Sequence, residues 1–206
     1  MRIYSSSEFA EMNGTVLEKA DGKVLEICRK RVEDHIKRVK YFYMVMVSEG
    51  FIPQKDLNIV EVMKHDKDKL LKANLERQAL RFSDNGKVSE KDLKKIDDVV
   101  REHIKSNRHH CEYWGEGDHN TKGMDCTAMP DKYIYEMMAD WFATAEEKGT
   151  PVMDWYNKSV GTRWVFTDKQ KELMLKCIGF LNAYYDSSKK RDYGLKYIDP
   201  ATVKTR

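Results

Sequence analysis

Several side chains in this sequence belong to the types that bind metal ions, and they are spread over separate segments. They are a lone His35, the consecutive pair His65 and Asp66, the doublet His109 and His110, and Asp140. Neutral imidazoles supply nitrogen ligands, and carboxylates offset the charge of a divalent cation. The order His, His-Asp, Asp on separate helices is a known way to build a divalent-metal site inside a helical bundle.

Each of these groups has a simpler interpretation when it is taken alone. A buried histidine is more often a hydrogen-bonded core residue than a metal ligand. Asp140 is harder to explain, because Met137, Trp141 and Thr144 place it on the side of a helix that should face the core. An unpaired carboxylate is costly there, so Asp140 needs a cation or a hydrogen-bond donor. A salt bridge with Arg or Lys is the alternative to a metal.

Apolar residues at steps of three and four predict the helices that must position these side chains. We expect helices over residues 23–48, 57–80, 89–107 and 130–149, a short one over 153–157 and a last one from Thr167. Asn85-Gly86 predicts a turn before the third helix, and Pro130 suits the first position of the fourth. The segment from Tyr113 to Met129 loses the periodicity and predicts an irregular loop, which is often functional at this length.

The composition indicates one soluble, mainly helical domain. The 206 residues are 41% hydrophobic and 34% charged, with only four prolines. This length suits a single domain, with a core over about residues 23–187 and a polar C-terminal tail. The 37 basic and 34 acidic side chains nearly cancel, which gives no strong nucleic-acid signal.

Targeting and redox signals are missing from the sequence. No stretch approaches the roughly 20 apolar residues of a membrane span, so we expect no membrane partner and a cytoplasmic location. The four cysteines are far apart and form no CxxC pair, which argues against a zinc ribbon and a disulfide framework. The oligomeric state is not predicted.

The spacing of the histidines and aspartates over about residues 30–144 resembles the HD-domain superfamily of metal-dependent phosphohydrolases. This resemblance implies an all-α fold, a single helical bundle of about five or six helices. It also implies that His35, His65, Asp66 and Asp140 hold a metal ion. Lys69 matches the lysine that follows the doublet in family branches with two metals.

Those branches carry further histidines between the doublet and the last aspartate. His103, His109 and His110 fall in that interval, so the resemblance implies one or two divalent ions, with Mn, Fe, Co, Mg, Ni and Zn not distinguished. Residues 109–117 look like the His-His-Glu region of cyclic-dinucleotide phosphodiesterases, although the Gly-Tyr-Pro of that family is absent here. Residues 107–110 and 136–141 are also similar to small uncharacterised proteins of bacteria and phages.

The implied reaction is hydrolysis of a phosphoester by a metal-activated water. Asp66 and Lys69 are the predicted catalytic residues, and the expected substrate is a nucleotide or another small-molecule phosphoester. The predicted substrate-binding residues are the cations Lys69, Arg108 and Lys122, with Tyr113 and Trp114 to stack on a base or sugar. Most of the 37 basic residues must nevertheless be solvated surface charges.

Two other classes of function remain open at this point. A non-haem di-iron oxygenase that resembles myo-inositol oxygenase would use the same scaffold and a comparable ligand set. A non-catalytic helical binding module or adaptor would keep the scaffold without turnover. Iron content with oxygen-dependent activity would favour the oxygenase, whereas phosphate release would favour the hydrolase.

Overall fold

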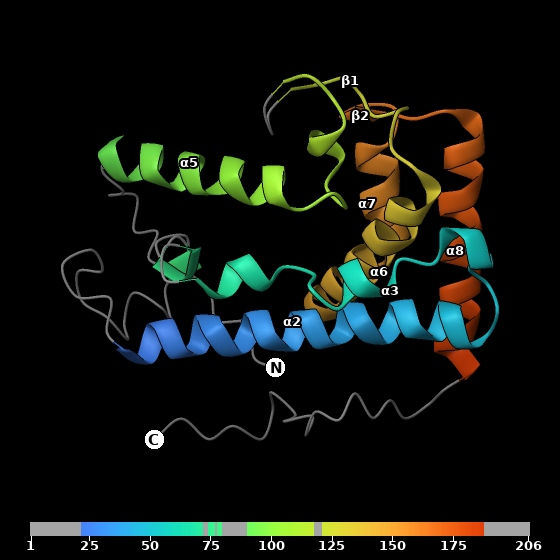
Figure 1. Ribbon diagram of the computed structural model, residues 1–206, viewed down its shortest axis with the longest axis horizontal. Coiled ribbons are helices and arrows are strands. Elements are labelled where there is room, and N and C mark those ends of the chain that lie inside the picture. The colour runs from blue at the N-terminus through green and yellow to red at the C-terminus, as the bar shows by residue number, and fades with distance from the viewer. Residues whose placement is uncertain (1–21, 72–73, 77, 80–89, 118–120, 188–206) are drawn as a thin grey trace. The chain divides into compact units, whose positions relative to one another are not determined.

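The computed structural model describes residues 22–71, 74–76, 78–79, 90–117 and 121–187, which are mostly helical (Figure 1). The α-helices are α2 (Gly22–Ser48), α3 (Ile59–Val62), α5 (Glu90–Ser106), α6 (Asp131–Lys148), α7 (Val152–Ser159) and α8 (Asp168–Ser187). None of these described helices is both long enough and apolar enough to cross a membrane. The prediction of a mainly helical protein is confirmed, and its assignment to the HD type stays a prediction.

The described residues fall into two compact units. The larger unit contains residues 35–65 and 104–187, and the smaller unit contains residues 22–34 and the described part of 66–103. Helices α2 and α5 contribute residues to both units. The single domain predicted from the sequence stays a prediction, and its polar C-terminal tail lies outside the described residues.

Helix α6 supplies much of the core of the larger unit and packs against α7 and α8. Pro130 precedes its first residue with a φ of −67°. Gly149 ends it in the left-handed conformation, with a φ of 65°, and its amide donates to the carbonyls of Ala145 and Glu146. Glycine adopts positive φ without steric cost, which explains the clean end of the helix. The end of the helix at Gly149 is confirmed, whereas Pro130, predicted as the first helical residue, is the extended residue just before the helix begins at Asp131.

Aromatic contacts join the helices of the larger unit. The Phe42 ring of α2 lies 5.6 Å from the Phe142 ring of α6. Phe51 follows α2 and stacks on Phe180 of α8, with ring centroids 4.4 Å apart. Met138 of α6 is fully buried in the same core. These contacts fix α2 against α6, the two helices that carry His35 and Asp140.

A short parallel pair of strands in the larger unit corrects the all-α prediction. Strand β1 (Met124–Asp125) pairs with β2 (Trp164–Val165), and Met124 lies opposite Trp164. Each strand has only two residues, too few to leave an alternating pattern in the sequence. The predicted loop from Tyr113 to Met129 contains β1, so part of it is held by pairing.

The helix predicted over residues 57–80 is wrong. Helix α3 ends at Val62, a turn follows, and a 3₁₀-helix spans Lys67–Leu70 in the smaller unit. Asp66 has a φ of 54° and is the one non-glycine residue with positive φ among those described. Left-handed backbone interrupts an α-helix, and aspartate tolerates it better than most side chains. Helix α5 confirms the third predicted helix, whereas the turn predicted before it lies outside the described residues.

Candidate metal centre

His35 of α2 and Asp140 of α6 face each other inside the larger unit. His35 Nε2 lies 3.0 Å from Asp140 Oδ1. Thr144, one turn further along α6, donates from its hydroxyl to the same oxygen at 3.5 Å. Burial alone would raise the pKa of Asp140, but the interaction with His35 and the charges of the nearby histidines hold that pKa well below its ordinary value. Asp140 is therefore an ionised carboxylate at neutral pH.

A second group in the same unit joins His65, His109 and Glu136. Glu136 Oε1 lies 3.0 Å from His65 Nδ1 and 3.3 Å from His109 Nδ1. The two imidazole rings are 4.1 Å apart, and all three side chains are almost completely buried. Burial would raise the pKa of Glu136, but the hydrogen bonds and charges of His109 and His65 lower it to about 2.

The tautomers of the two histidines follow from this contact. An ionised carboxylate only accepts hydrogen bonds, so the nitrogen that faces Glu136 carries the hydrogen. A metal-binding imidazole must be neutral, and with the hydrogen on Nδ1 the Nε2 atom keeps the lone pair that binds a metal. The Nε2 atoms of both rings are buried. Glu136 therefore selects the form of each histidine that coordinates through Nε2.

The donor atoms lie close enough together to hold a metal ion. His35, His65 and Asp140 form one such set, whose donor atoms lie within 4.8 Å of one another. The side-chain atoms of His65, His109 and Glu136 lie equally close, but there Glu136 faces Nδ1 of both histidines and orients them. Two ligands bound at roughly 2.1 Å to a tetrahedral ion are roughly 3.4 Å apart. The 3.0 Å between His35 and Asp140 is near that separation. Nitrogen and carboxylate donors suit Zn, Fe, Mn and Co.

Glu136 was not among the ligand candidates predicted from the sequence. The sequence could have indicated it by position, because Glu136 lies four residues before Asp140 and therefore occupies the same face of α6. Its second oxygen, Oε2, accepts from Asn58 Nδ2 at 3.5 Å. The backbone amide of Asn58 donates in turn to the Tyr43 hydroxyl at 2.7 Å. These contacts fix the carboxylate from the side away from the histidines.

A cavity of about 830 Å³ in the larger unit reaches the second group. His65, His109 and Glu136 form part of its wall. Its other charged lining residues are Glu61, Lys64, Lys105, Arg108 and Lys132, and its aromatic ones are Tyr113 and Tyr133. Its size falls within the range of small-molecule binding sites.

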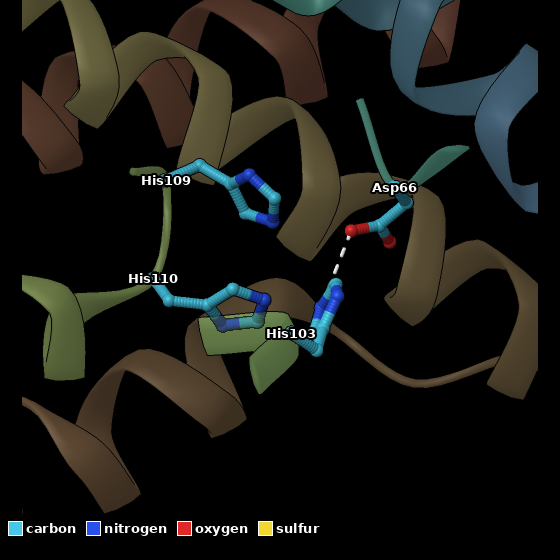
Figure 2. Close-up of side chains that lie close together, drawn as sticks. All are labelled: Asp66, His103, His109 and His110. Carbon is cyan, nitrogen blue, oxygen red and sulfur yellow. Dashed lines mark ion pairs between the residues drawn. The ribbon is translucent and has the colours of Figure 1, made fainter. Parts of the chain in front are cut away.

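The smaller unit contains its own polar network around Asp66. Lys69 Nζ donates to Asp66 Oδ2. His103 Nε2 lies 3.4 Å from Asp66 Oδ1, and Figure 2 marks this ion pair with a dashed line. His103 Nδ1 lies 2.6 Å from Asp68 Oδ2. Burial lowers the pKa of His103, while the hydrogen bond that its ring donates to Asp68 acts in the opposite direction. The buried Asp66 thus combines left-handed backbone with charged partners, a combination typical of functional sites.

The remaining predicted residues have mixed positions. The His110 ring lies 4.4 Å from that of His109 (Figure 2). Arg108 and Tyr113 line the cavity. Trp114 packs at 5.4 Å from Tyr133 and donates from Nε1 to the carbonyl of Arg108, and its predicted stacking role stays a prediction. Lys122 is exposed and is not part of the cavity wall.

Comparison with known proteins assigns a family but no activity. Residues 26–184 match the model of a family described as "Family of unknown function (DUF5662)". The match covers most of the chain, which therefore belongs to this family. No curated protein and no solved structure matches the chain significantly.

Proposed function

We propose that this chain is a metal-dependent phosphohydrolase of the HD-domain type that acts on a nucleotide or another small phosphoester. The observation that carries the proposal is the convergence of His35, His65 and Asp140, whose donor atoms lie within 4.8 Å of one another. They come from three separate segments of the larger unit. His65 is buried and His35 and Asp140 are mostly buried, and ionisable groups from distant segments rarely meet in such surroundings without a cation or a chemical role.

The chemistry of these donors fits a divalent metal. Asp140 is ionised, which offsets part of the charge of a cation. Glu136 orients His65 and His109 through Nδ1, as carboxylates commonly do for metal-binding histidines. A bound divalent ion would lower the pKa of a water molecule and polarise a phosphoryl oxygen.

Other residues of the chain would bind and orient the phosphoester. The cavity beside His65 and His109 offers cationic side chains for the phosphoryl oxygens, among them Arg108. In the smaller unit, Asp66 directly follows His65 in the chain and is held by Lys69. The HD resemblance implies that Asp66 is a ligand that orients water and that Lys69 stabilises developing charge, and both roles are part of the proposal.

Metal analysis of the purified protein, combined with an activity screen, tests the proposal. We compare wild type with His65→Ala and Asp140→Asn, and use Glu172→Gln, a change in an exposed pair on α8, as the control. Each preparation is assayed for phosphate release from nucleotides with Mn²⁺, Mg²⁺ or Co²⁺. We expect stoichiometric metal and phosphate release in wild type and control, and loss of both in the two site variants.

Two other results would contradict the proposal. Iron in the purified protein with oxygen consumption but no phosphate release would assign the oxygenase. A wild-type protein that contains no metal, and that stays inactive when metal is added, would leave a non-catalytic helical module.

A further inference from the structure

The cavity in the larger unit has an excess of positive charge. Its wall carries the four cations Lys64, Lys105, Arg108 and Lys132 but only two carboxylates. Both carboxylates are already engaged, because Glu61 lies 3.3 Å from Lys64 Nζ and Glu136 contacts two histidines. The cavity therefore favours a ligand with more than one negative charge.

Arg108 is held in a fixed position at this wall. Its Nη1 donates to the Tyr133 hydroxyl at 3.0 Å. Its guanidinium also lies 5.7 Å from the ring centre of Tyr113 and 6.0 Å from that of Tyr133. A guanidinium has five N–H donors in a fixed fork, so several remain for phosphate oxygens. Fixing it in advance reduces the entropy lost when an anion binds.

Lys105 and Lys132 supply positive charge that no carboxylate among the described residues neutralises. Within the part of the chain that the structure describes, neither ammonium group forms an ion pair. Lys132 Nζ lies 5.0 Å from the ring centre of Tyr133, which directs it toward the same wall as Arg108. Two cations without counterions and a fixed guanidinium form a site suited to anions.

The spacing along α6 sets the length of the ligand. Lys132, Glu136 and Asp140 follow one another at steps of four residues, so they share one face of the helix. With a rise of 1.5 Å per residue, the backbone at Lys132 lies roughly 12 Å along the helix from that at Asp140. A ligand that reaches from the metal centre toward Lys132 must be extended.

We infer that this cavity binds linked phosphate groups, so that the substrate is a diphosphate or triphosphate ester rather than a monophosphate. This inference rests on the proposed function for the position of the reacting phosphate. The binding of the anion itself depends only on Lys105, Arg108 and Lys132. One end of the chain of phosphates lies beside His65 and His109, and the other end contacts these cations.

Titration calorimetry with inorganic triphosphate and with orthophosphate tests the inference on the full chain as purified, without added metal. The test variant is Lys105→Gln combined with Lys132→Gln. Lys148→Gln is the control for one lost positive charge, because it makes the same substitution at an exposed position near the other end of α6. Unfolding midpoints verify that the variants stay folded.

We expect wild type to bind triphosphate at least tenfold more tightly than orthophosphate. Two charge-assisted contacts are lost in the double variant, so its affinity for triphosphate should fall at least tenfold. The Lys148→Gln control should stay within twofold of wild type. Triphosphate binding equal to that of orthophosphate, or an unchanged affinity in the double variant, would overturn the inference.

The two proposals fail in different ways. If triphosphate binding depends on the two lysines but the protein holds no metal and releases no phosphate, the anion site stands and the hydrolase proposal fails. If metal and phosphate release are present but the double variant keeps the wild-type KM for a nucleoside triphosphate, the hydrolase stands and the anion site is refuted.

Discussion

Replacing Glu136 with glutamine tests whether this carboxylate positions the histidines of the metal centre. The substitution keeps the size and shape of the side chain, and the amide oxygen can still accept a hydrogen bond. It removes the negative charge that faces His65 Nδ1 at 3.0 Å and His109 Nδ1 at 3.3 Å. We expect the variant to fold and to bind metal more weakly.

The size of the loss follows from these two hydrogen bonds. A hydrogen bond to a charged group contributes about 1.5–3 kcal/mol, whereas a neutral one contributes about 0.5–1.5 kcal/mol. Each bond to Glu136 should therefore weaken by about 1 kcal/mol, and the pair by about 2 kcal/mol. This corresponds to roughly a thirtyfold loss in affinity. It lies within the 10–100-fold that removal of such supporting carboxylates typically costs a metal site.

Cobalt binding followed by visible absorption, in competition with a chelator of known affinity, measures this loss. The Glu172→Gln variant should match wild type. An affinity for Co²⁺ within twofold of wild type in Glu136→Gln would refute the positioning role. A loss beyond about a thousandfold would also refute it, because it would make Glu136 itself a ligand.

Three further predictions concern stability. The free energy of unfolding in urea should be about 1 kcal/mol higher for Asp66→Gly than for Asp66→Ala, because only glycine adopts positive φ without steric cost. Equal values for the two variants would argue against left-handed backbone at this position. The pKa of Glu136 falls from 4.5 to about 2 on folding, so its ionised form stabilises the metal-free protein above pH 4.5 by about 3 kcal/mol. This contribution is lost as the pH falls toward 2. In denaturant titrations, the free energy of unfolding should therefore drop between pH 5 and pH 3 by about 2 kcal/mol less in Glu136→Gln than in wild type. Met138→Ala should cost about 2–5 kcal/mol in the same assay, because it leaves a cavity at a fully buried position; a cost below about 1 kcal/mol would contradict the packing of α6.

The long helices could be predicted from the sequence because their signals are local. Helix α6 has a proline before its first residue, a glycine after its last and apolar side chains at helical spacing between them. The prediction of a helix over residues 57–80 was wrong because the spacing of apolar residues does not reveal that a single residue adopts left-handed backbone. Asp66 adopts this conformation where its side chain contacts Lys69 and His103. These contacts form only when the chain folds. The β1–β2 pair is likewise a tertiary event between short segments about 40 residues apart.

The candidate site was predicted in part, for a physical reason. His35 and Asp140 interrupt apolar helix faces, where a polar side chain is costly, so the sequence itself marks them as unusual. Glu136 carries no such mark, because glutamate is common on helices and is usually solvated. The lysines of the cavity are equally inconspicuous among 37 basic residues. Only the fold separates Lys105 and Lys132, which line the cavity, from Lys122, which does not.

Helix α6 offers a physical reason why one segment would serve metal binding and substrate binding together. Residues at steps of four lie on one face, so Asp140, Glu136 and Lys132 present the proposed metal ligand, a carboxylate that contacts two histidines and a cation in that order. Each step advances roughly 6 Å along the axis. Because these distances are set by the helix rather than by loops, the separation between the metal ligand and the cation would be fixed before substrate binds. Such preorganisation reduces the free-energy cost of aligning a phosphoester with the metal centre, which is the condition that the proposed reaction requires.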